Sequence, residues 1–186
     1  MTLDEIYQKQ ESLEARLTHL EDVEAIQKMT YEYFDCVTLG KTDRLIDFFA
    51  DDCAFVIPRG RIEGREQVKS YLDELCGWHT GAESNFLIHP IIEAEGDHAR
   101  GHWLIYFINT YYLTSQPLFV TASMYDNEYV KVNGEWKFKK VHWIMRFGPP
   151  APPPFPGCHG LKMVGEADLR GFGDPLKQVS KPNTED

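Results

Sequence analysis

The stretch Tyr129-Val130-Lys131-Val132-Asn133-Gly134-Glu135-Trp136-Lys137-Phe138 predicts a β-hairpin, and this hairpin decides the fold class. Asn133-Gly134 favours a two-residue turn, because both of its residues adopt positive φ angles at little cost. Gly96-Asp97 marks a second break between two earlier strand-like runs. The expected strands are, in chain order, about 85–94, 100–113, 118–132 and 135–147. They predict an antiparallel sheet in the second half of the chain.

The first half of the chain carries helical patterns. Residues 3–20 have a thin apolar stripe among charged side chains, which suits packing against a neighbour. The stripe consists of Ile6, Leu13, Leu17 and Leu20. Beyond Asp22 the apolar face widens, and we expect a buried helix that ends at Gly40. The remaining expected elements are a short helix at 43–50 with Thr42 as its N-cap, a strand at 53–57, a turn at 58–60 and a helix at 65–76. Helices before a long antiparallel sheet indicate an α+β fold.

Length and composition limit the function classes. With 186 residues and 42% hydrophobic content, the chain suffices for one domain with a full core. The net charge of −10 and the pI of about 5.1 argue against nucleic acid and anionic membranes as partners. No run of eighteen apolar residues and no signal-peptide pattern occur. The four cysteines form no CxxC pair, so we expect reduced thiols and a cytoplasmic protein. We expect one domain over residues 1–160 and a partly flexible C-terminal extension over 161–186.

His89 is the most informative candidate site residue. It lies in Asn85-Phe86-Leu87-Ile88-His89-Pro90-Ile91-Ile92, a run that is otherwise almost wholly apolar. We therefore expect a buried imidazole, and a buried polar group without a partner costs about 1–3 kcal/mol. Two interpretations remain open: a hydrogen-bonded core histidine, or a functional group that faces a central cavity.

Helix and strand periodicity place further polar groups. On the long helix, Tyr31, Asp35 and Thr38 share one face, whereas Tyr33 lies on the apolar face, where a tyrosine usually fills core. Among the strands, Asn109 is in phase with Trp103 and Phe107, as a strand-end hydrogen bonder or a substrate contact.

The last strand carries Arg146, in phase with His142. An arginine here forms either a surface ion pair or part of a site. Trp143 is out of phase with Arg146, so the two side chains meet only if a bulge shifts the strand. The seven histidines include no HxH and no HExxH motif, and no GxSxG motif is present. We therefore expect no metal.

The chain resembles the SnoaL-like branch of the nuclear transport factor 2-like superfamily over about residues 20–147. The segments that carry the resemblance are Leu20-Glu21-Asp22-Val23-Glu24-Ala25-Ile26-Gln27, Tyr33-Phe34, Thr42-Asp43-Arg44-Leu45, Phe49-Ala50-Asp51-Asp52-Cys53, Gly64-Arg65-Glu66-Gln67-Val68 and 129–138. The nearer similarities are to bile acid 7α-dehydratase, scytalone dehydratase and hexachlorocyclohexane dehydrochlorinase. The resemblance implies a cone-shaped (cystatin-like) fold, in which helices and a curved antiparallel sheet enclose an apolar pocket. It also implies a cofactor-free lyase in a homo-oligomer, a trimer or a dimer.

The resemblance assigns site residues position by position. The family's catalytic histidine corresponds to His89, its helix tyrosine to Tyr33, and its later polar positions to Asn109 and Arg146. The family's helix carboxylate corresponds to Thr38, which is a departure, and Asp35 one turn away is the candidate replacement.

Two functions follow as hypotheses. The first is a cofactor-independent lyase, for dehydration, isomerisation or carbon–carbon cleavage, that acts on a bulky aromatic or alicyclic molecule. In this lyase His89 abstracts a proton. Tyr33 acts as an acid or hydrogen bonder to the leaving oxygen, and Asp35 replaces the carboxylate that assists the histidine. Asn109 and Arg146 hold and polarise the substrate. The expected substrate contacts are Tyr31, Thr38, Trp103, Phe107, Tyr125 and Trp143. The second is a non-catalytic binding or assembly module of the same fold. We expect the oligomer to form through the outer face of the sheet and the N-terminal apolar stripe.

Overall fold

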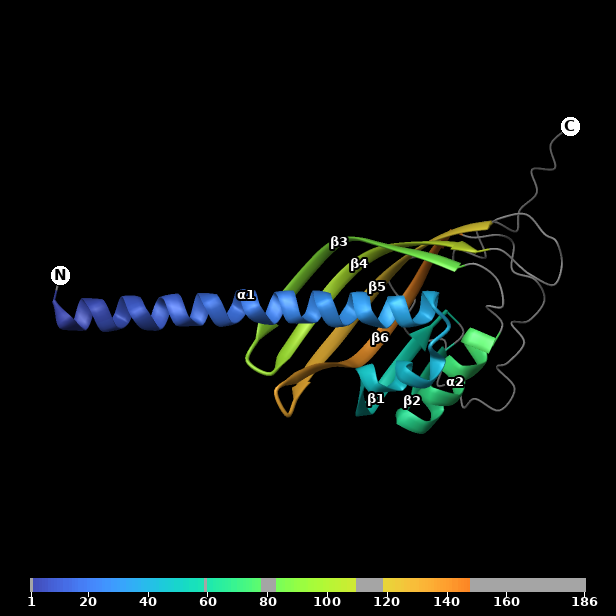
Figure 1. Ribbon diagram of the computed structural model, residues 1–186, viewed down its shortest axis with the longest axis horizontal. Helices are drawn as coiled ribbons and strands as arrows, with labels where there is room; N and C mark the ends of the chain where they lie inside the picture. Colours follow the sequence, from blue (N-terminus) through green and yellow to red (C-terminus); the bar gives the residue numbers. More distant parts are fainter. Residues whose placement is uncertain (1, 59, 78–82, 110–118, 148–186) are drawn as a thin grey trace, which may run out of the picture.

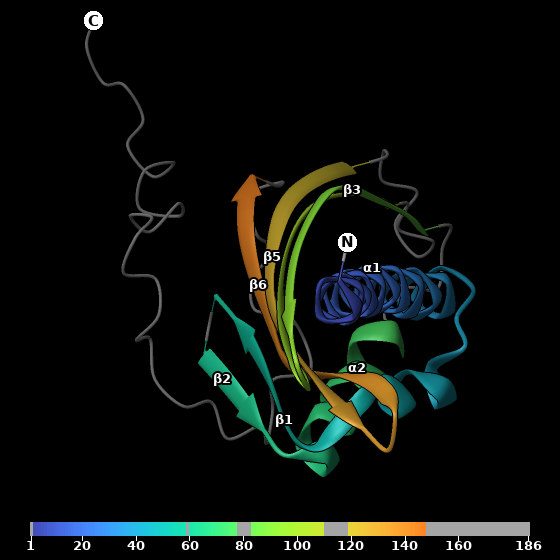
Figure 2. The same ribbon diagram turned by 90° about the vertical axis from the view of Figure 1, so that its left-hand side faces the viewer.

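A curved six-stranded sheet wraps round one long helix (Figures 1 and 2). The computed structural model describes residues 2–58, 60–77, 83–109 and 119–147. Its elements are α1 (Leu3–Thr38), the 3-10 helix η1 (Thr42–Phe48), β1 (Phe49–Ile57), β2 (Gly60–Glu63), α2 (Arg65–Gly77), β3 (Glu83–Glu95), β4 (His98–Asn109), β5 (Phe119–Val132) and β6 (Glu135–Phe147). The strand order is β2-β1-β6-β5-β4-β3. The α+β prediction is confirmed, and no helix in the described ranges is long and apolar enough to cross a membrane.

Helix α1 is a single helix of 36 residues, although its apolar stripe changes width near Asp22. Thr2 caps its N-terminus in a reciprocal capping box with Glu5. At the other end Gly40 has φ +65°, and the Gly40 and Lys41 amides bond back to the Val37 and Cys36 carbonyls. This left-handed glycine stops the helix as the sequence predicted.

The β5–β6 hairpin forms at Asn133-Gly134, where both residues have positive φ. Its tip is fastened to α1 by Asp22. The Asp22 carboxylate accepts a hydrogen bond from Trp136 Nε1 at 2.9 Å and pairs with Lys131 Nζ at 2.6 Å. Burial alone would raise the pKa of Asp22, but the bonds from Lys131 and Trp136 outweigh it, and the pKa lies below its ordinary value.

Several local predictions need correction. Thr42 is not an N-cap, because η1 starts after Lys41 without a side-chain capping bond. Strand β1 begins at Phe49 and replaces the end of the expected helix at 43–50. Strand β2 was not predicted. It pairs antiparallel with β1, while β1 pairs parallel with β6, so one pair of the sheet departs from the expected antiparallel order. These pairings are long-range, so local periodicity does not show them.

The core lies between α1, η1, α2 and the concave face of the sheet. Tyr33, 3% exposed, packs its ring edge-on against Phe34, Phe48, Phe49 and Phe138. Tyr33 therefore fills core, as a tyrosine on the apolar face of a helix usually does. Cys36, Cys53 and Cys76 are buried free thiols.

Asp22→Asn should destabilise the fold by about 1–3 kcal/mol at neutral pH, because it removes a charged acceptor shared by two donors. The folded-state pKa of Asp22 is depressed, so this stabilisation is complete above the ordinary value of 3.8 and is lost as the pH falls through the lower folded value. Urea unfolding at pH 7 and at pH 3 measures the difference.

The matched control is Asp43→Asn at an exposed site, which should leave the unfolding midpoint nearly unchanged. A gap between wild type and Asp22→Asn that is as large at pH 3 as at pH 7 would contradict the electrostatic account.

Candidate functional site

The strand register lines up three aromatic side chains on the concave face of the sheet. Trp103 of β4 is opposite Tyr125 of β5, and Tyr125 is opposite Trp143 of β6. The Trp103 ring meets the ring of Tyr31 from α1 edge-on, with centroids 5.6 Å apart. This face of the sheet therefore looks toward the helix.

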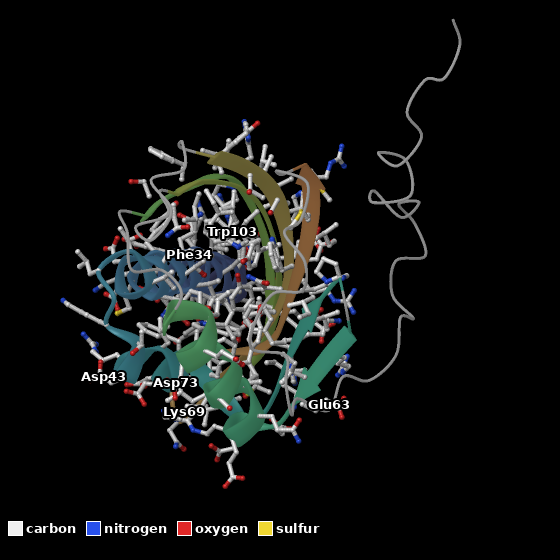
Figure 3. The ribbon with its side chains drawn as sticks, turned by 90° about the vertical axis from the view of Figure 1, so that its right-hand side faces the viewer. Phe34, Asp43, Glu63, Lys69, Asp73 and Trp103 are labelled. Atoms are coloured by element: carbon white, nitrogen blue, oxygen red, sulfur yellow. The ribbon has the colours of Figure 1, made fainter. Side chains whose placement is uncertain are left out.

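Phe34 lies one turn along α1 from Tyr31. Its ring and those of Phe107, Tyr125 and Trp143 form what we call the aromatic cluster. Their neighbouring centroids are between 5.6 and 6.5 Å apart. Phe107 and Trp143 remain only half-buried, so they keep ring surface available for a ligand. Trp143 Nε1 donates to Ser123 Oγ at 2.7 Å, which fixes its indole. Figure 3 shows Phe34 and Trp103 inside the space between helix and sheet, whereas Asp43, Glu63, Lys69 and Asp73 lie at the periphery.

A polar pair borders the aromatic cluster. Asn85 of β3, opposite Phe107 of β4, donates from Nδ2 to Thr38 Oγ1 at 2.9 Å. Asn85 Oδ1 is buried and has no hydrogen-bond partner among the described residues. A buried acceptor in this state calls for a donor, and a ligand hydroxyl can supply one. The sequence analysis missed Asn85, although strand phase with Leu87 was a signal for it.

Beneath the cluster lies a buried polar network centred on Tyr129. Its hydroxyl accepts hydrogen bonds from Trp103 Nε1 at 2.9 Å and Asn127 Nδ2 at 3.2 Å, and lies 3.4 Å from Thr30 Oγ1. Burial raises the pKa of Tyr129, so the phenol stays neutral. Trp103 is 0% exposed in this network, which makes it the floor of the site. Its predicted substrate contact stays a prediction.

His89 is exposed, so the expectation of a buried imidazole is wrong. Ile88 pairs with Leu104 and Ile91 pairs with His102, so His89 and Pro90 together oppose Trp103 in a β-bulge. The cause is Pro90, which has no N–H for the strand ladder. At the bulge His89 takes φ +51°, a left-handed conformation that is uncommon for residues other than glycine.

Two contacts fix how β3 runs beside α1. Asn85 bonds to Thr38 near one end, and His19 Nδ1 lies 3.2 Å from the Ala94 carbonyl oxygen near the other. At about 3.3 Å per strand residue and 1.5 Å per helix residue, His89 lies ~13 Å from Asn85, level with the turn of α1 that carries Tyr31. Thr38, the residue at the family's carboxylate position, bonds to Asn85. His89 therefore lies about 13 Å along β3 from the Asn85 end of this pair.

The remaining predicted catalytic residues are Asp35, Arg146 and Asn109. Asp35 is exposed on α1. Arg146 is exposed, and its Nη1 lies 3.7 Å from Met124 Sδ. Met124 is the neighbour of Tyr125 on β5, so its side chain belongs to the convex face. A strand irregularity occurs next to Arg146, between Ala122 and Ser123 of β5. The side chain of Asn109, at the end of β4, lies outside the described part of the structure.

The convex face carries a groove of about 410 Å³. His102 Nδ1 and Asp126 Oδ1 lie 2.5 Å apart there, beside the ion pair of Lys140 with Glu128. Lys140 holds the pKa of Glu128 below its ordinary value. This charged, open lining suits water better than an apolar ring. Among the described residues, no group of three or more His, Cys, Asp or Glu side chains is placed to hold a metal ion.

A family model for the SnoaL-like domain matches residues 18–142. The chain belongs to this family. Comparison with curated proteins finds no match.

Solved structures share the fold of this SnoaL-like chain. One is a candidate scytalone dehydratase from Novosphingobium aromaticivorans, with a TM-score of 0.64 and 22% identity over 69% of this chain and 87% of that one. A hexachlorocyclohexane dehydrochlorinase, LinA type 2, gives 0.63 and 20% over 73% and 92%. A protein of unknown function from Mycobacterium tuberculosis gives 0.61 and 17% over 86% and 91%. At these identities the likeness establishes the fold.

Tyr129→Phe should lower the free energy of unfolding by about 2–4 kcal/mol, because it leaves the buried N–H groups of Trp103 and Asn127 without an acceptor. Chemical denaturation followed by circular dichroism measures the loss. Tyr7→Phe, at a side chain that is 63% exposed, is the control and should have almost no effect. Equal stability of the two variants would show that the donors find another acceptor.

Proposed function

We propose that this SnoaL-like chain is a cofactor-independent lyase that binds a bulky aromatic or alicyclic small molecule against the aromatic cluster. The observation that carries the proposal is the pairing of exposed ring surface with an unsatisfied buried acceptor. Phe107 and Trp143 offer the surface, and Asn85 Oδ1 offers the acceptor. Rings next to a few fixed polar groups are the usual composition of a small-molecule site.

The proposed base is His89. A non-glycine residue held at a positive φ in a bulge costs conformational energy, and such strain concentrates at functional sites. The bulge also turns the imidazole out of the regular strand pattern and leaves it exposed. By the strand and helix spacing, it lies level with Tyr31 on α1. Proton abstraction by an imidazole starts dehydration, isomerisation and related carbon–carbon cleavage alike.

The partner of His89 is the open question of the mechanism. Thr38 cannot provide the negative charge that a carboxylate would, and its hydroxyl is bonded to Asn85. Asp35 is the proposed replacement, one turn from Tyr31 on the same face of α1. Tyr33 as acid, with Asn109 and Arg146 as polarising groups, completes the proposed set. Of these, Tyr33 and Arg146 have the weakest support, because Tyr33 is buried among phenylalanine rings and Arg146 contacts Met124.

The test compares turnover of hydroxylated aromatic and alicyclic compounds by single variants. His89→Ala should reduce the rate by roughly 10²–10⁴-fold, as expected for a lost general base. The matched control is His98→Ala, another exposed histidine of the sheet, which should keep full activity. Retention of full activity in His89→Ala would remove this histidine from the mechanism.

Two further variants separate the ways in which His89 is assisted. If Asp35 replaces the family carboxylate, Asp35→Asn should lower the rate by a similar ~10²–10⁴-fold and Arg146→Ala should change little. If the enzyme instead works by polarising its substrate, Arg146→Ala should lower the rate and Asp35→Asn should change it little. Full activity in both variants would exclude both residues from the mechanism.

The alternative is a binding module without catalysis, and Thr38 in place of the carboxylate favours it. Binding of ring compounds should then quench tryptophan fluorescence in the wild type and equally in His89→Ala, with no turnover by either. Phe107→Ala distinguishes the location of binding, because loss of a ring from the aromatic cluster should weaken affinity by roughly tenfold or more.

A further inference from the structure

Within the described part of the structure, the first half of α1 projects away from the sheet. Figure 1 shows it as a rod that projects beyond the sheet, and every residue from Thr2 to Glu21 is exposed. This segment is about 30 Å long at 1.5 Å per residue. A lone helix of this size is only marginally stable in water, since helices depend on packing of an apolar face.

The projecting segment has such a face, with a seven-residue repeat. Its two core positions, a and d, alternate at spacings of three and four residues. The a positions are Leu3, Gln10 and Leu17, and the d positions are Ile6, Leu13 and Leu20. The five apolar side chains among them are between 41% and 72% exposed. Two and a half heptads of unburied leucine and isoleucine indicate a coiled-coil seam without its partner.

The rest of the protein leaves this seam accessible. The first contacts of α1 with the sheet come from His19 to the Ala94 carbonyl and from Asp22 to Trp136. In the heptad these are the c and f positions, on the side of the helix away from a and d. Seen end-on in Figure 2, the sheet curves round one side of α1 and leaves the other side open.

Charges beside the seam specify the partner. The g positions carry Lys9 and Arg16, and the e positions carry Tyr7, Glu14 and Glu21. In a parallel, in-register coiled coil, each g residue faces the e residue five positions later on the partner helix. Lys9 then meets the partner's Glu14, and Arg16 meets the partner's Glu21. An antiparallel pair would instead set g against g and e against e, so that like charges face each other.

We propose that residues 3–21 form a parallel, in-register coiled coil with the same residues of a second copy of this chain. Gln10 supports the register, because an amide at an a position can both donate to and accept from the same amide of its partner. In a parallel coiled coil, a rotation axis along the rod relates the two chains. The folded remainder of each chain therefore lies at the same end of the rod, with the candidate sites on the same side of the assembly.

Cysteine cross-linking of the full chain tests the seam, in a Cys158→Ser background because Cys36, Cys53 and Cys76 are buried. Leu13→Cys, at a d position, should form a disulfide-linked dimer under mild oxidation at least about tenfold faster than Ala15→Cys, which lies at an outward f position. Equal rates for the two variants would overturn the coiled coil. Both sites are exposed, so neither substitution threatens the fold.

A mixture of Ile6→Cys and Leu20→Cys chains, with tags of different size, tests the direction. These positions are about 21 Å apart along one helix. The parallel arrangement gives only 6–6 and 20–20 dimers, whereas predominance of the mixed 6–20 dimer would establish an antiparallel pair and overturn the proposal.

Charge reversal tests whether the flanking residues select the partner. In the Leu13→Cys background, Lys9→Glu with Arg16→Glu should slow cross-linking about tenfold or more, and so should Glu14→Lys with Glu21→Lys. Mixing these two variants should restore fast cross-linking, because each acidic flank then meets a basic one. Unchanged rates in both variants, or a mixture as slow as either alone, would overturn the assignment of Lys9, Arg16, Glu14 and Glu21.

Discussion

The interior of this protein depends on one acceptor, the hydroxyl of Tyr129. It takes hydrogen bonds from Trp103 on β4 and Asn127 on β5, and it lies next to Thr30 of α1. The ring fits because Gly101 has no side chain, and a Cβ there would come within 2.8 Å of Tyr129 Cε2. Sheet curvature, helix position and the orientation of Trp103 are thus tied to a single buried group, where a missing partner is expensive.

This constraint separates the buried end of the cone from the end at which we propose that a ligand binds. Toward Ile26 and Phe138 the aromatic rings are buried, and the Tyr129 hydroxyl joins three neighbouring polar side chains, although Asn127 Oδ1 also lacks a partner among the described residues. Toward Phe107 and Trp143 ring surface stays accessible, and Asn85 Oδ1 lacks a partner among the described residues. The Tyr129 network therefore forms a bonded floor beneath the aromatic cluster.

What the sequence could predict followed from local signals. Asn133-Gly134 specified its hairpin because the turn residues alone determine the backbone, and Gly40 ended α1 for the same reason. The β1–β6 pairing and the bond from Trp136 to Asp22 join residues far apart in the chain, so periodicity does not reveal them. His89 was misplaced because its apolar neighbours indicated burial, although Pro90 already made a regular strand unfavourable. Arg146 was assigned by resemblance to a position that here contacts Met124.

The Thr38–Asn85 pair limits the chemistry that the proposed lyase can carry out. A neutral hydroxyl–amide pair orients nearby groups, but it cannot stabilise an imidazolium as a buried carboxylate does. Unless Asp35 supplies that charge, as proposed above, the barrier to proton abstraction by His89 must be lowered from the substrate side. A proton beside a carbonyl or an electron-rich ring is acidic enough for such a base when a fixed donor receives the developing charge. Rings that hold an aromatic or alicyclic substrate against the cluster then contribute mainly by positioning, which can supply a large share of the rate. The replacement of one carboxylate by Thr38 thus favours substrates activated by their own structure.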